Sequence, residues 1–359
     1  MWWKDKGEAV KCRIQKKQNI NMKAVALVRT GIASRAFEIK EVPKPEAGPG
    51  QILIKVEAFG LNFADVIARH GKYKDAPPIP AVLGYEVVGR IESIGKEVLS
   101  FQPGQRVTAF TRFGGYAEYA VTDARAAARI PEDMDAGVGA ALATQYCTAW
   151  FCAEEMVCLH KGDQVLIQAA AGGVGTALTQ LCKRKGCVVF GTTGSDEKME
   201  YVRSIGADYA INYKSHDFVQ EIRKITDKPI DVVFDSGGGK TFRNGKSLLG
   251  AGGRIIGYGA AEQMEKKTIL GSIKLLFDFG FTNPVFLLMS SKSILGVNML
   301  RMADQRPDVL QRCLKNVVAL ASVGEIQPKV GGKFKATEIA EAHAFLESRK
   351  STGKIILNW

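Results

Sequence analysis

The chain has 359 residues, of which 46% are hydrophobic and 24% charged, a balance typical of globular proteins and not of disordered ones. This length allows two domains, and no run of 18 uncharged apolar residues exists, so we expect no transmembrane span. The formal net charge of +12 is compatible with nucleic acid, an acidic membrane surface or a phosphorylated ligand, and we favour a solvated basic surface with no specific nucleic-acid target.

Residues 1–21 carry six basic and two acidic side chains and lack the apolar core of a secretory signal. One arginine and no serine also make this stretch a poor mitochondrial presequence. We expect a flexible extension, with the fold beginning at Met22. The seven cysteines have no CxxC spacing, which favours reduced thiols and a cytoplasmic location.

Residues 22–144 consist of short alternating segments, such as QILIKVEAFG and PGQRVTAF, separated by glycine and proline. This pattern predicts a small β-rich domain of twisted, barrel-like strands. One short helix is expected at 62–70, with Asn62 as its N-cap and Asp65 three residues later.

The sequence QVLIQAAAGGVG at 164–175 joins an apolar strand to a glycine-rich turn, and a helical pattern follows at 176–185. This order of strand, turn and helix is the one that a dinucleotide-binding turn requires, here in an AxxGxxG form. We expect Gly172 and Gly173 to adopt backbone angles closed to other residues, and Gly175 to let the helix approach the strand. The free N–H groups here, Val174 included, would face a pyrophosphate.

Strands and helices alternate after residue 144. With the apolar strand before the glycine turn counted as the first, this alternation predicts six parallel strands in a doubly wound sheet. The expected strands are 188–191, 209–212, 231–235, 254–258 and 294–297, and the expected helices are 197–205, 217–225 and 241–248. Two later helices, 307–323 and 336–348, and a last strand, 354–357, should return to the first domain. The predicted domains are therefore 22–144 with 299–359, and an inserted nucleotide-binding domain at 145–298.

The end of the second predicted strand reads Gly-Thr-Thr-Gly-Ser at 191–195, with no acidic residue to hold a ribose 2′-hydroxyl. Neutral side chains such as Thr192 and Ser195, followed by Lys198, can accept a 2′-phosphate that an acid would repel. NADPH is therefore favoured over NADH, although Lys198 could also be an ordinary solvent-facing lysine.

Several segments together resemble the zinc-free medium-chain dehydrogenases/reductases of the quinone oxidoreductase group, and the second half is most similar to the vesicle amine transport protein branch. They are GLNFADVIARHGKY (60–73), LGYEVVGRIESIGKEVLSFQPGQRV (83–107), GGYAEYAV (114–121), AAAGGVGTALTQL (169–181), INY (211–213) and GKIIL (353–357). The resemblance implies a GroES-like catalytic domain with an inserted Rossmann domain, and a homodimer.

The same resemblance implies roles for single residues. Asn62 would lie beside the nicotinamide and Tyr73 would line the substrate cleft, although a helix cap and a packing aromatic are the alternative readings. Lys198 and Tyr213 would contact the adenosine 2′-phosphate. The residues at the ends of the fifth and sixth strands would contribute backbone groups to the cofactor site: Gly257, Gly296, Val297 and Asn298.

Asn62 and Tyr85 occupy the positions where zinc alcohol dehydrogenases have a ligand cysteine and a ligand histidine. Ile67 replaces a tyrosine that is frequent in the family, so no proton-donor role carries over there. We expect no metal site, and without a Lewis acid the favoured hydride acceptors are quinones and α,β-unsaturated carbonyls.

Two functions of different classes follow. The first is an NADPH-dependent oxidoreductase that transfers hydride to a small-molecule quinone or enone without zinc. The alternative is an NADPH-binding interaction protein at a membrane surface or on RNA. The basic tail and the phenylalanine-rich stretch at 270–289 suggest this alternative. That stretch could also be core, a dimer contact or the mouth of the cleft.

Overall fold

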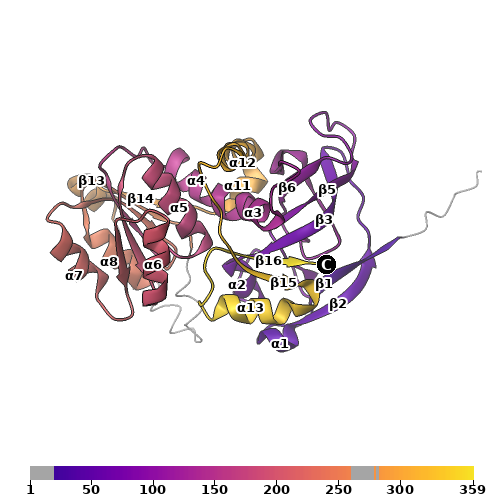
Figure 1. Cartoon of the computed structure of the whole chain (residues 1–359), viewed down its shortest axis with the longest axis horizontal. Helices are drawn as coiled ribbons and strands as arrows, with labels where there is room; N and C mark the ends of the chain where they lie inside the picture. Colours follow the sequence, from indigo (N-terminus) through magenta and orange to yellow (C-terminus); the bar gives the residue numbers. More distant parts are fainter. Residues whose placement is uncertain (1–19, 260–278, 280–282) are drawn as a thin grey trace, which may run out of the picture.

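A computed structural model of the chain describes residues 20–259, residue 279 and residues 283–359. It has two lobes side by side, one built around a parallel sheet and one around antiparallel strands (Figure 1). The extension expected at 1–21 falls on residues 1–19, which lie outside the described residues, and on the start of the first strand. That strand begins at Asn21, one residue before the predicted Met22.

The strand pairs of the first lobe are antiparallel except for one, and those of the second lobe are all parallel. The strands are β1 (Asn21–Leu27), β2 (Phe37–Pro43), β3 (Gln51–Leu61), β4 (Ala81–Val82), β5 (Glu86–Ile94), β6 (Arg106–Phe110), β7 (Tyr119–Asp123), β8 (Ala127–Arg129), β9 (Gln164–Ile167), β10 (Val188–Thr193), β11 (Tyr209–Asn212), β12 (Ile230–Asp235), β13 (Leu249–Gly257), β14 (Ser293–Gly296), β15 (Val330–Lys335) and β16 (Lys354–Asn358).

The helices include two π-helical turns, η2 and η3, and two 3-10 turns, η1 and η5. They are α1 (Ala33–Ala36), α2 (Phe63–Arg69), η1 (Ala124–Ala126), α3 (Ala136–Ala141), η2 (Leu142–Tyr146), α4 (Cys147–Trp150), η3 (Phe151–Glu155), α5 (Gly173–Arg184), α6 (Asp196–Ser204), α7 (Phe218–Ile225), α8 (Gly239–Ser247), α10 (Pro284–Ser290), α11 (Met299–Gln305), α12 (Pro307–Ser322), η5 (Ala336–Glu338) and α13 (Ile339–Glu347).

The six-stranded sheet has the order β11-β10-β9-β12-β13-β14, and all of its pairs are parallel. Strand β9 lies at its centre with every residue buried, as a strand covered on both faces requires. The predicted doubly wound sheet is therefore confirmed. Strand β13 starts at Leu249, five residues before the predicted start. The prediction is wrong here because Gly250, Gly252 and Gly253 interrupt the apolar pattern by which strands are predicted.

The first lobe contains a seven-stranded sheet of order β15-β16-β3-β5-β6-β8, with β7 paired to β3, and a small sheet of order β2-β1-β4. Strands β15 and β16 are parallel, and the other pairs are antiparallel. This is the predicted β-rich fold. Strand β16, from the end of the chain, pairs with β3 so that Ile355 lies opposite Leu61. The register places Lys354, the first residue of β16, next to the start of helix α2.

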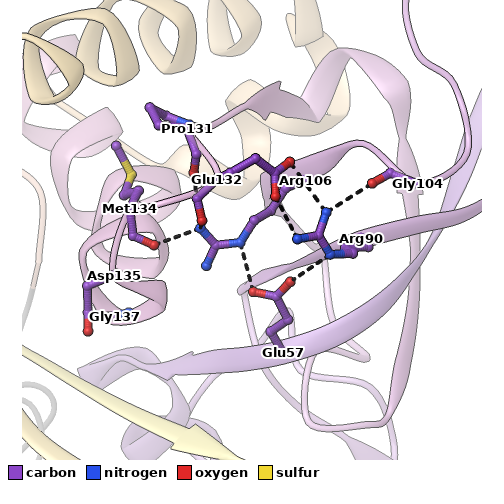
Figure 2. Close-up of polar contacts among 9 residues, drawn as sticks. All are labelled: Glu57, Arg90, Gly104, Arg106, Pro131, Glu132, Met134, Asp135 and Gly137. Carbon is purple, nitrogen blue, oxygen red and sulfur yellow. Dashed lines mark hydrogen bonds and ion pairs between the residues drawn. The ribbon is translucent and has the colours of Figure 1, made fainter.

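Arg106 organises the segment that leads from this lobe toward the parallel sheet (Figure 2). Its guanidinium donates to the carboxylate of Glu57 at 2.9 Å and to the carbonyls of three residues in the turn before α3. These are Pro131 at 3.0 Å, Glu132 at 3.1 Å and Met134 at 2.7 Å. Helix α3 continues into η2 and α4, so Arg106 fixes the start of a helical run that reaches the second lobe.

Cys147 in α4 and Cys152 in the following η3 are buried, whereas Cys158 lies beyond the end of η3 and is exposed. No helix in the described ranges is long and apolar enough to cross a membrane. Most of the phenylalanine-rich stretch lies outside the described residues. Its last part forms α10, on which Phe286 and Leu288 are 70% and 81% exposed.

Candidate active site

A cleft of about 1480 Å³ opens between the two lobes. One wall is the edge of the parallel sheet at the carboxyl ends of its strands, where such sheets bind their ligands. The other wall comes from α2 and from the loop before β5. The cleft brings together the following predicted site residues: Asn62, Tyr73, Gly172, Gly173, Val174, Gly175, Lys198, Tyr213, Gly257, Val297 and Asn298.

The turn between β9 and α5 forms the middle of the sheet wall. Its shape corrects the expectation for two glycines, because Gly172 has a φ of −74° and Gly173 has no positive φ. The residue with a left-handed backbone is Ala169, at φ +52°, whose carbonyl accepts the N–H of Gly172 at 2.9 Å. Gly175 acts as predicted, since a methyl group there would collide with the backbone at Ala169 and Ala170.

Two buried amide side chains complete the turn. Gln145, from η2, fills the space that a side chain on Gly173 would need, which explains the glycine. Its Oε1 and the Nε2 of Gln168 are both buried and have no hydrogen-bond partner among the described residues. Because an unsatisfied buried polar atom is costly, such atoms in a cleft wall mark positions where a polar ligand fits. Sequence reasoning missed both glutamines, which carry no motif.

The two predicted residues outside the lining lie just behind it. Thr192 is fully buried, and its hydroxyl donates to the Oε1 of Gln168 at 2.6 Å, so it orients a cleft residue instead of facing a ligand. Ser195 is half-buried and precedes α6 as its N-cap. The first residue of α6, Asp196, accepts a hydrogen bond from Asn212 at 2.9 Å.

Basic side chains gather at the end of the cleft beyond β10. Lys198 lies there with the phenol of Tyr213, and Lys214 and Arg349, which sequence reasoning missed, lie beside them. Lys198 donates to the carbonyls of Arg349 at 2.6 Å and Ser351 at 2.7 Å, so α6 is tied to the chain before β16. Burial and the nearby charge of Lys214 lower the pKa of Lys198. A dianionic group here would relieve that repulsion.

The segment after β14 also lines the cleft. The N–H of Val297 donates to the carbonyl of Gly257 at 2.9 Å, which extends the sheet by one residue. The side chain of Asn298 caps α11 by accepting the N–H groups of Leu300 and Arg301 at 3.0 and 3.3 Å. The Oδ1 of Asn298 therefore holds the start of a helix and is already occupied by these two N–H groups.

Asn62 forms part of the opposite wall, at the start of α2. Its backbone N–H donates to Asp65 at 2.9 Å, so the helix end is held by the carboxylate of Asp65. The Asn62 side chain points elsewhere: its Nδ2 lies 2.8 Å from both oxygens of Glu86, and its Oδ1 accepts from Lys354 at 3.0 Å. Asn62 is therefore the N-cap of α2, as the sequence predicts, and its amide also has partners outside the helix.

Two tyrosines stand beside Asn62. The rings of Tyr73 and Tyr85 are 6.3 Å apart and meet edge to face at 78°. Burial raises the pKa of both phenols, so both stay protonated at neutral pH and can donate hydrogen bonds into the cleft. Below them Asp65 is fully buried, and burial raises the pKa of its carboxyl to about 7.

Within the part of the chain that the structure describes, no group of three or more His, Cys, Asp or Glu side chains is arranged to hold a metal ion. Asn62 and Tyr85 both line the cleft, and their amide and phenol are not the side chains that bind zinc in known sites.

Comparison with known families and proteins agrees with this architecture. The family described as "Alcohol dehydrogenase GroES-like domain" matches residues 48–132, and the family described as "Zinc-binding dehydrogenase" matches residues 173–315. The chain is 32% identical over 337 residues to the synaptic vesicle membrane protein VAT-1 homolog of Danio rerio, which covers 92% of this chain and 69% of the relative. It is 31% identical over 310 residues to the quinone oxidoreductase of Homo sapiens, covering 86% of this chain and 88% of the relative.

Among solved structures, a mycobacterial protein complexed with NADPH superposes with a TM-score of 0.82 at 27% identity. The superposition covers 94% of this chain and all of that one. The likeness therefore extends over both lobes and the cleft between them.

Proposed function

Since the chain belongs to the medium-chain dehydrogenase/reductase superfamily, in the group of the quinone oxidoreductases and VAT-1 proteins, we propose that it is an NADPH-dependent reductase of quinones or α,β-unsaturated carbonyls. The observation that carries this proposal is the arrangement of the cleft. A glycine turn at the edge of the parallel sheet faces Asn62 and two protonated tyrosines across it.

The residues of the sheet wall fit NADPH. The first N–H groups of α5, at Gly173, Val174 and Gly175, have no partner within the helix and point to where a pyrophosphate would lie. The unsatisfied amides of Gln145 and Gln168 lie beside this turn and suit the ribose or carboxamide groups. The basic end of the cleft suits a 2′-phosphate. NADPH would supply a hydride at its nicotinamide ring.

The chain's own residues would do the rest by positioning and by hydrogen bonding. Asn62 would set the face of the cleft against which the nicotinamide lies. Tyr73 and Tyr85, as neutral phenols, would donate hydrogen bonds to an acceptor carbonyl as it gains negative charge. The proton that completes the reduction would come from water or Tyr73.

The rest of this wall favours apolar, electron-poor acceptors. It is lined by Leu61, Phe63, Ile67, Phe110 and Leu300. We assign no zinc to the reaction because Asn62 and Tyr85 stand at the ligand positions. Quinones and enones accept hydride without the Lewis acid that oxidation of an alcohol needs.

A steady-state assay of NADPH oxidation tests this proposal with two acceptors, an ortho-quinone and an alkenal, after dialysis against a zinc chelator. The expected result is turnover with at least one acceptor that survives the dialysis. Measurable NADPH binding without turnover of either acceptor would contradict the proposal.

A homodimer is part of the proposal, supported by the exposed apolar side chains of α10 and by the edge strand β14 that follows it. Light scattering at micromolar concentration measures the assembly directly. A monomer at all concentrations would contradict it.

The exposed face of α10 and the names of the VAT-1 relatives also support a second candidate, an NADPH-binding protein that associates with membranes. Co-sedimentation with acidic liposomes, with and without residues 1–21, separates the two functions. Failure to sediment at every salt concentration would remove the second candidate.

A further inference from the structure

Behind the cleft wall, Asn62, Glu86 and Lys354 form a buried polar cluster. The side chains of Glu86 and Lys354 are 0% exposed and form an ion pair. The ammonium of Lys354 also donates to the Oδ1 of Asn62 at 3.0 Å and to the carbonyl of Leu61 at 3.2 Å. Of the three side chains, only Asn62 lines the cleft.

The charges of this cluster determine which way the Asn62 amide faces. An ammonium can only donate hydrogen bonds and an ionised carboxylate can only accept them. The oxygen of the amide must therefore face Lys354, and its nitrogen must face Glu86, as observed. If the amide were turned over, its nitrogen would face the ammonium of Lys354, donor against donor, and its oxygen would face the carboxylate of Glu86, acceptor against acceptor. Such mismatches are most costly in a buried site.

The backbone around Lys354 links the same amide to the glycine turn. The N–H of Gly353 donates to the carbonyl of Ala171 at 3.0 Å, and Gly353 forms a parallel bridge with Gly172. The N–H of Lys354 donates to the carbonyl of Lys329 at 2.7 Å. Gly353 thus contacts the glycine turn through its main chain, and Lys354 contacts Asn62 through its side chain.

We propose that Lys354, acting with Glu86, is a positioning residue for hydride transfer that fixes the amide of Asn62 against the nicotinamide. The inference rests on the proposed NADPH-dependent function. A buried ion pair contributes little net stability compared with apolar residues of similar volume, so stability alone is a weak reason for this pair. Its contact with a cleft-lining amide gives the pair a role in the site.

The test uses the full chain and removes both charges together in E86Q/K354M, because K354M alone would leave Glu86 buried without its partner. The double variant is compared with wild type, with N62A and with the triple variant N62A/E86Q/K354M. K315M, an exposed lysine on α12, is the matched control. Each protein is measured for kcat, for the NADPH dissociation constant and for the fluorescence of bound NADPH without acceptor.

E86Q/K354M is expected to lose about 10- to 100-fold in kcat, a loss of the size seen when the partners that orient metal-ligating side chains are removed. Its NADPH dissociation constant should stay within about threefold, because the main-chain contacts of Gly353 remain. In the N62A background the same two substitutions should cost less than about threefold, because no amide is left to orient. K315M should match wild type.

A loss of equal size in both backgrounds would overturn the inference, as would a kcat for E86Q/K354M within threefold of wild type. If wild type itself turns over no acceptor, the proposed function fails, and the fluorescence arm still tests the inference. There the emission of NADPH bound to E86Q/K354M should shift toward that of free NADPH at unchanged affinity. An emission identical to wild type would contradict a positioning role.

Discussion

The ammonium of Lys354 lies 3.0 Å from the amide oxygen of Asn62, although 292 residues separate the two in the sequence. The antiparallel pairing of β16 with β3 creates this contact, because it places the start of the last strand beside the end of β3. The last strand therefore supports, from behind the cleft wall, a lining residue that lies near the N-terminus in the sequence.

Gly60 leaves the space that the Glu86–Lys354 pair occupies, since a methyl group there would collide with the end of both side chains. Gly60→Ala is expected to lower the free energy of unfolding by about 1–3 kcal/mol, as overpacking of a filled interior does. Chemical denaturation measures this loss. Gly48→Ala is the control, because its methyl would meet only the end of the Gln51 side chain. Equal stability of the two variants would contradict the account.

Asp65 makes stability depend on pH near neutrality. Burial, with a smaller repulsion from Glu86, raises the pKa of its carboxyl from 3.8 to about 7 in the folded state. Between pH 3.8 and about 7 the folded state therefore keeps a proton that the unfolded state releases. The free energy of unfolding that this proton contributes falls as pH rises over this range and is lost once pH passes 7. Relative to Asp65→Asn, wild type should lose about 2 kcal/mol of unfolding free energy between pH 5.5 and 7.5.

Urea titrations of both proteins at a series of pH values measure this difference. A constant difference over the whole range would show that Asp65 is already ionised at pH 5.5.

Arg106 should contribute more to stability than exposed arginines do. Its side chain is 7% exposed and bonds to three carbonyls as well as Glu57. Arg106→Met would remove all four of these part-buried hydrogen bonds at once, one of them to a charged group, and we expect a loss of about 3 kcal/mol in the free energy of unfolding. Arg125→Met, whose side chain is 57% exposed and paired with Asp123, should cost less than about 1 kcal/mol. Similar losses in the two variants would argue against the role of Arg106.

Lys198 should distinguish the two nicotinamide cofactors. Because it lies with Lys214, Tyr213 and Arg349 at one end of the cleft, we expect it to bind the 2′-phosphate that only NADPH carries. Lys198→Met should raise the KM for NADPH about 10-fold or more, as loss of a hydrogen bond to a charged group does, and change the KM for NADH less than about threefold. Lys228→Met, an exposed lysine of the same lobe, is the control. A parallel change for both cofactors would refute this assignment.

The parts of the molecule that could be predicted from the sequence are those that depend on local pattern. The strand, glycine turn and helix around Gly175 and the alternating strands that follow are each encoded by a short stretch of neighbouring residues, and the sheet appears as expected. Asn62 was found as a cleft residue through family resemblance. Its partners Glu86 and Lys354 were not, because side-chain contacts across a sheet leave no periodic signal in the sequence.

The errors in the glycine turn have a similar physical origin. Gly172 and Gly173 were assigned unusual backbone angles from their residue type alone, but the positive φ falls on Ala169 and the close approach is that of Gln145 to Gly173. Gln145 comes from η2, about 28 positions earlier, so the reason for the glycine is tertiary. Arg349 could not be predicted for the same reason, because it reaches the basic end of the cleft from the loop before β16, which is distant in the sequence.

We propose that this cleft holds NADPH for direct hydride transfer to a conjugated acceptor. This proposal is tested most directly by turnover of an alkenal with NADPH deuterated at C4, after dialysis against a zinc chelator. We expect a saturated product with deuterium at its β-carbon when one of the two C4 faces of NADPH is labelled, and a product without deuterium when the other face is labelled. NADPH that binds but is never oxidised by an alkenal or an ortho-quinone, or a product without deuterium from either label, would contradict the proposal.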